Sequence, residues 1–258
     1  MKTLNLVGPG AVDLADRLVP HFDGRVATVE TLPETAARDT DAGAAYGLSS
    51  DGSWIGAGDG QTLADLLDSL VPDYDVALTI GFDAHIPTVT VADADAVGDV
   101  VATLPDVEAD LDPVLDAVSA LDDRVTLESL VERVKASPLA ERSGAIATFT
   151  GRVRVKDSPD DAPTTQLEFE KYEGVAADRM QAIREELEAR DGVFEVLMHH
   201  RTGVIREGED IVFVVVLAGH RAEAFRTVED GIDRLKDEVP IFKKESTTDE
   251  EFWIHEQA

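Results

Sequence analysis

The sequence predicts two domains of different fold class, an α/β domain with a parallel sheet followed by an α+β domain with a largely antiparallel sheet. At 258 residues the chain exceeds the usual length of one domain. In the first half, short apolar strands alternate with helical patterns, as in parallel sheets. In the second half, several strands are separated only by turns. We place the domains at residues 1–104 and 123–258, joined by an acidic linker at 105–122.

The first domain opens with a strand, a tight turn and a helix. The apolar run from Leu4 to Val7 predicts the strand, and Gly8-Pro9-Gly10 predicts the turn. An apolar pattern through Val12 and Phe22 predicts the helix. Later patterns predict strands at 25–29, 75–80 and 87–91, a helix at 62–70, and a hairpin or long loop at 43–59.

The first turn lacks the residues of a phosphate-binding loop. The pattern G-x-x-x-x-G-K-[ST], started at Gly8, requires Gly, Lys and Ser or Thr where the chain has Asp13, Leu14 and Ala15. The dinucleotide pattern G-x-G-x-x-G also fails at Asp13. Because a carboxylate at this position repels phosphate, we favour a scaffold or docking role for this domain, with nucleotide binding as the alternative.

The second domain is predicted from alternating and helical apolar patterns. We expect a helix at 112–121 in the linker and another that starts after Thr126 and ends at Ser137-Pro138. Patterns with a period of two predict strands at 144–156, 165–172, 193–201, 211–218 and 252–255. Patterns with a helical period predict helices at 176–187 and 220–239.

The charge of the chain excludes some classes of partner. The sequence has 53 acidic and 23 basic residues, a formal net charge of -30, which argues against a nucleic-acid partner. A dense acidic surface is typical of proteins that work in molar salt, so we expect a halophilic origin. No apolar run is long enough to span a bilayer and no secretory signal is recognisable, so we expect a cytoplasmic protein without a membrane partner.

The cations are concentrated in the second half. Residues 121–258 carry 19 basic side chains, whereas residues 1–120 carry 4. In the predicted helix at 220–239, Phe225, Val228, Ile232 and Leu235 form one apolar stripe, and Lys236 projects only about 20° from Phe225. We therefore expect Lys236 to be partly desolvated, although a lysine near a helix C-terminus also commonly extends to water.

These cations predict a site for an anion. His220 and Arg221 lie at the start of the predicted helix, where further positive charge favours a phosphate or carboxylate ligand. Arg154, Lys236 and Lys243 are expected to complete the pocket. We do not expect metal binding at His199-His200, because neighbours on a strand point to opposite faces. The absence of cysteine excludes thiolate chemistry by the chain itself.

Two family resemblances follow from these residues. In the first half, VGPGAVDLADRL, GRVATVE, DTDAGAAYGLSSDGSWIGAGDG and YDVALTIGF resemble the P-loop adaptor proteins of molybdopterin-guanine dinucleotide assembly over residues 1–95. In the second half, GAIATFTGRVR, LEFEKYEG, HHRTGVIREGE, AGHRAEAF, IDRLKDEVPIFKKE and FWIHE resemble, in order and spacing, the large catalytic subunit of molybdopterin synthase over residues 123–256. The chain therefore resembles a fusion of the two, with the phosphate loop of the first degenerate.

The second resemblance implies a sulfurtransferase. Two large subunits dimerise within a heterotetramer, and each accepts the C-terminal tail of a small ubiquitin-like subunit that ends as a thiocarboxylate. The sulfur passes to cyclic pyranopterin monophosphate and forms the dithiolene of molybdopterin, without a cofactor. The alternative function, implied by the first resemblance, is a GTP-binding adaptor or carrier for molybdopterin.

The same resemblance assigns roles to individual residues. The catalytic lysine falls on Lys236, whose pKa burial would lower, and a second active-site lysine falls on Lys243. Arg154 and Lys243 are expected to hold the phosphate, with His220 and Arg221 lining the same pocket. A tryptophan of the family is replaced by Phe242, and a basic residue that often follows the C-terminal Trp-x-E segment is not evident after Trp253.

Overall fold

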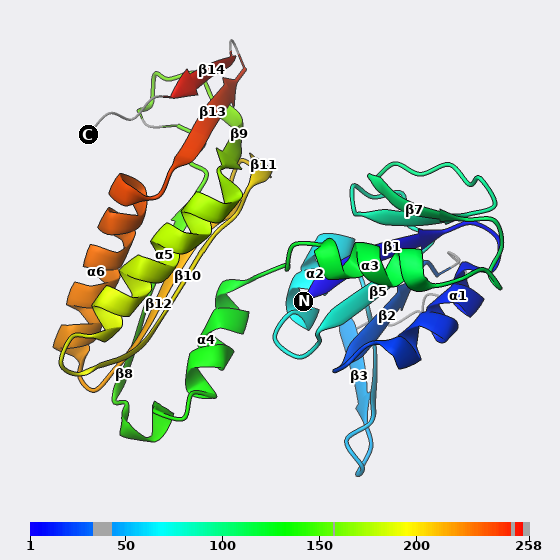
Figure 1. The fold of residues 1–258 in the computed structure, drawn as a ribbon, viewed down its shortest axis with the longest axis horizontal. Helices are drawn as coiled ribbons and strands as arrows, with labels where there is room; N and C mark the ends of the chain where they lie inside the picture. The colour runs from blue at the N-terminus through cyan, green and yellow to red at the C-terminus, as the bar shows by residue number, and fades with distance from the viewer. Residues whose placement is uncertain (33–42, 157, 249–250, 255–258) are drawn as a thin grey trace. The chain divides into compact units, whose positions relative to one another are not determined.

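The chain forms two compact units, Met1–Thr126 and Leu127–Ala258, each with a hydrophobic core of its own (Figure 1). The computed structural model describes residues 1–32, 43–156, 158–248 and 251–254. Their order is β1 (Lys2–Val7), α1 (Ala11–Leu18), η1 (Val19–His21), β2 (Val26–Glu30), β3 (Ala44–Leu48), β4 (Trp54–Gly58), α2 (Leu63–Leu70), β5 (Val76–Ile80), β6 (Thr88–Val91), β7 (Val100–Leu104), α3 (Asp112–Ala120), α4 (Leu127–Lys135), η3 (Ala140–Arg142), β8 (Ala145–Arg152), β9 (Thr164–Lys171), α5 (Glu173–Glu188), β10 (Val193–His200), β11 (Gly203–Arg206), β12 (Asp210–Ala218), α6 (Arg221–Glu238), β13 (Ile241–Thr247) and β14 (Glu251–Ile254).

The first unit contains the expected parallel sheet. Its five strands lie in the order β2-β5-β1-β6-β7, and all neighbouring pairs are parallel. Leu4 and Leu6 of β1 point to one face of the sheet, where the apolar side chains of α1 and α3 complete the core. The α/β prediction for this half is therefore confirmed.

The turn after β1 is closely packed. Gly8 and Gly10 both have positive φ, at 119° and 74°, a conformation that glycine adopts without strain. A Cβ on Gly8 would collide with the carbonyl oxygen of Val91, and a Cβ on Gly10 would lie 2.6 Å from Val107 Cγ1. The loop at the N-terminus of α1 is thus filled in part by Val107, and Asp13 lies in the first turn of the helix.

The structure differs from the sequence prediction at the join between the domains. Residues 105–122 were expected to be a linker, but α3 lies within them and buries Val114 and Val118 in the core of the first unit. The strand β7, which was not predicted, pairs with β6. The apolar positions of β7 and α3 therefore belong to the first unit, and the division falls after Thr126.

The hairpin expected at 43–59 is present as β3 and β4. These two strands pair only with each other among the described residues, in an antiparallel ladder from Ala44↔Gly58 to Leu48↔Trp54. Part of their apolar surface is exposed, as Leu48 and Trp54 illustrate.

The second unit contains two antiparallel sheets, as the α+β prediction requires. One has the strand order β10-β12-β8, and the other has the order β11-β9-β13-β14. Strand β11 was not predicted, and the terminal strand ends at Ile254, while His255 lies outside the described residues.

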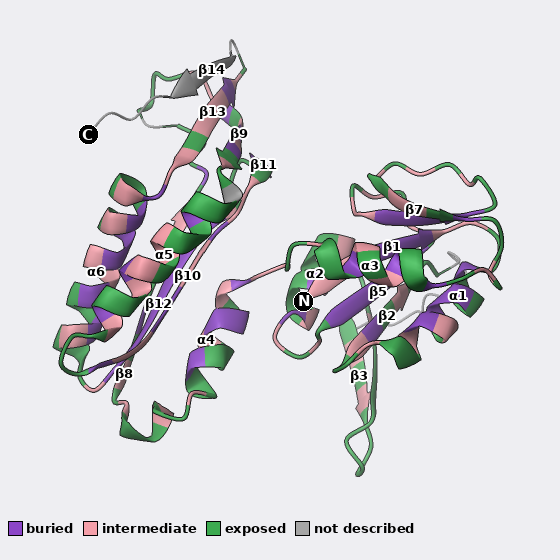
Figure 2. Ribbon diagram, viewed as in Figure 1, coloured by how far each residue is buried: buried purple, intermediate pink, exposed green. Residues whose placement is uncertain are grey.

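The core of the second unit is centred on β12. The residues from Ile211 to Ala218 are all buried, as the continuous purple of this strand shows (Figure 2). Because alternate side chains point to opposite faces, this burial requires cover on both faces. Helices α4 and α6 both pack against β12, and α5 packs against β10 and α6.

Helix α6 ends where the sequence predicts. Pro240 follows its last residue, Glu238, by two positions, and the residue before a proline is driven out of the helical conformation. Val239 has an extended backbone, and the chain continues directly into β13.

No helix among the described residues has the length and apolarity that crossing a membrane requires.

Candidate active site

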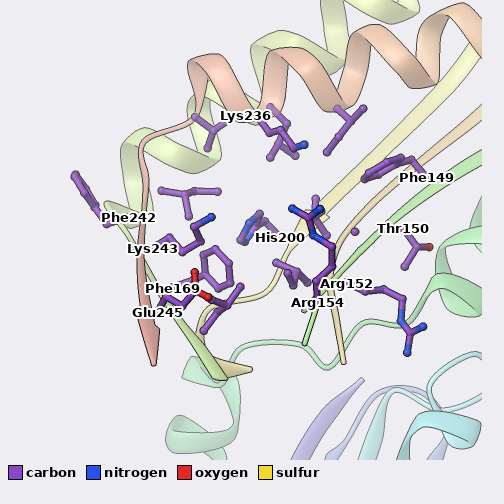
Figure 3. Close-up of a pocket in the computed structure, with 18 of the residues that line it drawn as sticks. Phe149, Thr150, Arg152, Arg154, Phe169, His200, Lys236, Phe242, Lys243 and Glu245 are labelled. Carbon is purple, nitrogen blue, oxygen red and sulfur yellow. The ribbon is translucent and has the colours of Figure 1, made fainter. Parts of the chain in front are cut away.

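One open cavity of about 860 Å³ lies in the second unit, where the end of α6 meets the two sheets (Figure 3). This volume is in the range of sites that hold small molecules. Three of the predicted site residues, Arg154, Lys236 and Lys243, line it together. The cavity therefore gathers cations from an inter-strand loop, a helix and a strand in a chain that is strongly acidic overall.

Strand β13 places Lys243 on the cavity side of its sheet. In the antiparallel ladder Lys243 is opposite Phe169 of β9, so both side chains point to the same face. Both line the cavity. The next residue, Lys244, is opposite Glu168 on the other face and lies 3.8 Å from its carboxylate. The alternation of the strand thus separates the two adjacent lysines, and only Lys243 is directed to the cavity.

Helix α6 places Lys236 in its last turn, at the cavity. The side chain is exposed, so the expectation of partial desolvation is wrong for this chain by itself. The same error affects Phe225, which is 63% exposed although it was assigned to the buried stripe. The buried residues of α6 are instead Ala224, Thr227, Gly231, Ile232 and Leu235.

A rotation of the buried face explains both errors. At about 100° per residue, Phe225 and Lys236 point in nearly the same direction, roughly 100° from the centre of the residues that are buried. Gly231 lies near that centre, and a Cβ added there would be 3.1 Å from Val214 Cγ1. The small residues allow α6 to approach β12 closely, and the large aromatic side chain remains outside.

The last turn of α6 is held against α5 by an ionic network. Arg234 Nε lies 2.7 Å from Glu238 Oε1, and Arg234 Nη2 lies 2.7 Å from Glu186 Oε2. Arg179 of α5 also donates to Glu238. Hydrogen bonds from Arg234 lower the pKa of the Glu238 carboxyl. Arg234 and Glu238 lie two residues before and two residues after Lys236, so the network fixes the helical turn that carries Lys236.

Arg154 follows the end of β8, which stops at Arg152 and not at the predicted residue 156. Both arginines line the cavity, and both are exposed. Arg152 Nε forms an ion pair with Asp210 at 3.2 Å, and its guanidinium also donates to the carbonyl oxygen of Gly208. Arg152 is therefore committed to the neighbouring turn.

His220 and Arg221 do not line this cavity. They lie at the N-terminus of α6, where both are exposed, whereas Lys236 lies in its last turn. Fifteen residues of helix separate Arg221 from Lys236, which corresponds to roughly 22 Å along the axis. A single copy of the chain therefore does not bring the predicted pair together with the other predicted site residues.

Sequence reasoning missed His200 as a site residue. It ends β10, lines the cavity and is only 8% exposed (Figure 3). Its ring packs edge-on against Phe169 at 4.9 Å between centroids, and Nδ1 lies 2.7 Å from the carbonyl oxygen of Arg201. Its neighbour His199 stacks on Phe213 instead, which agrees with the expected alternation of the two rings. The alternation of side chains along the strand could have shown that one of the two histidines faces the interior.

His200 is held in its neutral form at neutral pH. Burial lowers the pKa of its imidazole to about 4, and the positive charge of Lys171 lowers it further, whereas the backbone contact at Arg201 raises it. Because a carbonyl oxygen only accepts hydrogen bonds, the proton of the neutral ring resides on Nδ1. Nε2 is then an acceptor.

No group of three or more His, Asp or Glu side chains that suits a metal ion was found among the described residues.

Comparison with known proteins identifies the family. The family model described as MoaE protein matches residues 121–238. A probable molybdopterin synthase of Haloferax volcanii is 61% identical over 261 residues, covering 100% of this chain and 100% of that protein. The chain belongs to the MoaE family of molybdopterin synthases. The prediction of a molybdopterin synthase catalytic subunit, a transferase of molybdenum cofactor biosynthesis, is therefore confirmed.

Further molybdopterin synthase proteins match about half of this chain. The molybdopterin synthase catalytic subunit of Pyrococcus abyssi is 36% identical over 124 residues, which is 48% of this chain and 82% of that protein. The crystal structure of molybdopterin synthase from Staphylococcus aureus has 33% identity and a TM-score of 0.42, and the match covers 45% of this chain and 82% of that one.

Proposed function

We propose that the chain transfers sulfur from the thiocarboxylated C-terminus of a small ubiquitin-like subunit to cyclic pyranopterin monophosphate, forming the dithiolene of molybdopterin. The observation that carries this proposal is the grouping of Arg154, Lys236 and Lys243 around one cavity in a member of the MoaE family. The name "catalytic subunit" of the Pyrococcus relative implies a second subunit. Because the chain has no cysteine, the sulfur must arrive on that partner.

The three cations divide the work by position. Lys236 is exposed in the last turn of α6, where an incoming C-terminal tail can reach it, so its amine is placed to exchange protons with the thiocarboxylate or to engage the acyl carbon. Lys243 and Arg154 bind the phosphate of the pterin substrate, since ammonium and guanidinium groups form charge-assisted hydrogen bonds with phosphate. A tail seated over Lys236 would remove it from water.

The cavity is completed by a second copy of the chain. His220 and Arg221 are too far along α6 to reach the cavity of their own copy, yet the family resemblance assigns them to the pocket. A two-fold dimer resolves this distance, because each copy can present the N-terminus of α6 to its partner. The unit of function is then a dimer of this chain with two small subunits.

The replacement Lys236→Ala tests the reaction. Full-length protein is incubated with thiocarboxylated small subunit and pyranopterin substrate, and molybdopterin is measured. The variant should lose dithiolene formation while it keeps the oligomeric state of the wild type. Lys135→Ala is the matched control, because Lys135 lies on α4 and pairs with Glu132 away from the cavity. Wild-type turnover by Lys236→Ala would contradict the proposal.

For the first unit we propose a scaffold derived from the P-loop adaptor proteins of guanine dinucleotide assembly. Its parallel sheet and its turn from β1 to α1 support this origin. Val107, which packs against the turn, and Asp13, in the first turn of α1, oppose phosphate binding. Titration calorimetry with GTP and Mg²⁺ should give no heat of binding. Saturable binding of GTP would favour the alternative, a GTP-dependent adaptor or carrier.

The site of action also remains a prediction. We expect a cytoplasmic enzyme, and fractionation of cells that express the tagged chain would check this location.

A further inference from the structure

We propose that His200 is a specificity residue, whose Nε2 accepts a hydrogen bond from a ring N–H of the pterin substrate. This inference rests on the proposed function and adds a contact that the cation cluster does not supply. A pterin carries N–H donors on its ring as well as the anionic phosphate, so its recognition requires acceptors as well as donors.

The position of His200 supports a contact with the ligand. The residue lines the same cavity as Lys236 and Lys243, and the close-up shows its ring within this group of side chains (Figure 3). The ring is fixed at two points, by Phe169 at its edge and by the backbone at Nδ1. A ring held in this way presents its remaining nitrogen in a constant direction, as a specificity contact requires.

The second nitrogen of the ring is not used in the contact with the backbone, and His200 lines the cavity. The hydrogen bond of the ring is made through Nδ1, which leaves Nε2 for a ligand. The alternative is a purely structural role, in which the Nδ1 contact and the packing on Phe169 are the whole purpose of the residue.

The chemical surroundings select a donor as the ligand group. Arg154, Lys236 and Lys243 around the cavity are donors, and the carboxylate of Glu245 already accepts from the hydroxyl of Thr164. Burial of the ring, with a smaller effect from Lys171, favours its neutral form, in which Nε2 has no proton to donate. A phosphate or thiocarboxylate oxygen only accepts hydrogen bonds, so it is not a suitable partner for this nitrogen. A heterocyclic N–H donates and is a suitable partner.

Two substitutions separate the ligand role from the structural role. In His200→Gln the side-chain carboxamide extends to the position of Nε2 and can still accept a hydrogen bond there. In His200→Asn the shorter carboxamide overlays Nδ1, so it can donate to the Arg201 carbonyl but has no acceptor at the Nε2 position. The proposal expects Gln to retain function, and a structural role expects Asn to do so.

The experiment measures KM for the pterin and for the small subunit separately, with the full-length chain and thiocarboxylated partner. We expect His200→Asn to raise KM for the pterin by about 10-fold or more, because a substrate N–H left without an acceptor in the site weakens binding. We expect KM of His200→Gln for the pterin to stay within about 3-fold of the wild-type value. Binding of the pterin without sulfur donor, followed by calorimetry, should show the same order.

Five outcomes are possible, and each supports or contradicts a stated claim. A pterin KM that rises for Asn and not for Gln supports the inference. Equal values for both variants, the reverse order, or a KM that rises for the small subunit in place of the pterin would overturn it. A wild type that makes no molybdopterin would refute the proposed function itself, and this result is distinct because the wild type serves as the reference in every arm.

Discussion

The burial of His200 should make the second unit sensitive to mild acid. In the folded chain its pKa is about 4, against an ordinary value of 6.5. Between these two pH values the unfolded chain binds a proton at this position and the folded chain does not. Stability therefore decreases as the pH falls below about 6.5, and the contribution of His200 levels off below about pH 4.

The magnitude follows from the pKa difference. Each pH unit in this window costs about 1.4 kcal/mol, so lowering the pH from 7 to 5 should reduce the free energy of unfolding by about 2 kcal/mol through His200 alone. Other titrating groups also respond to acid, so the useful quantity is the difference between the wild type and His200→Gln, which lacks the imidazole and keeps the other groups.

The assay is urea unfolding of both proteins at pH 7 and pH 5, at one fixed KCl concentration. We expect the stability of the wild type relative to His200→Gln to fall by about 2 kcal/mol between the two pH values. A relative stability that does not change would mean that His200 is not a buried neutral imidazole, and the argument from its burial would fail. An NMR titration of the His200 ring in the folded wild type, expected to show no protonation above about pH 5, checks the same point directly.

Three further results are expected. Mixing the inactive variants Lys236→Ala and Arg221→Ala should restore part of the activity, because a mixed dimer contains one intact cavity; no recovery after verified subunit exchange would exclude shared sites. Gly8→Ala should lower the stability of the first unit by more than about 2 kcal/mol, because its Cβ meets the backbone of Val91, whereas Gly60→Ala, with φ of 76° and open space around it, should cost about 1 kcal/mol; equal thermal shifts would contradict this ranking. Raising KCl from 0.1 M to molar concentration should increase the midpoint of thermal unfolding, since a net charge of -30 repels itself less when screened, and an unchanged midpoint would argue against halophily.

Local patterns in the sequence were sufficient to predict the main elements of both units. The alternation of β8 to β10 and the stop of α6 before Pro240 follow from rules that involve near neighbours only. The parallel sheet of the first unit was likewise predicted from the strands that alternate with helices in that half.

The elements that were missed depend on distant partners. Strand β7 has a mixed, half-exposed sequence, and its identity comes from pairing with β6. Strand β11 has only four residues, and its identity comes from pairing with β9. In both cases the signal lies in another part of the chain, which a pattern within a short window cannot contain.

The candidate site was predicted in part. Helical spacing and the family resemblance identified Lys236, Lys243 and Arg154, which line one cavity. Helical spacing alone placed Lys236 on the border of the wrong face, because the largest apolar residue, Phe225, was taken to mark the core. The contact between α6 and β12 depends on Gly231, which has no side chain and so lets the two elements approach closely. A pattern of hydrophobic residues does not identify such a position.

Helix α6 also fixes the distance and the relative direction of the side chains at its two ends. His220 and Arg221 stand at one end, and Lys236 stands in the last turn at the other. Inserting or deleting one residue between them would rotate one end by about 100° relative to the other and change their separation by about 1.5 Å. Substitutions on the exposed face of α6 between its two functional ends can be tolerated, but a change in the length of the helix cannot, even where no residue of the cavity is touched. The length of this helix is therefore as much a part of the enzyme as the lysine that it carries.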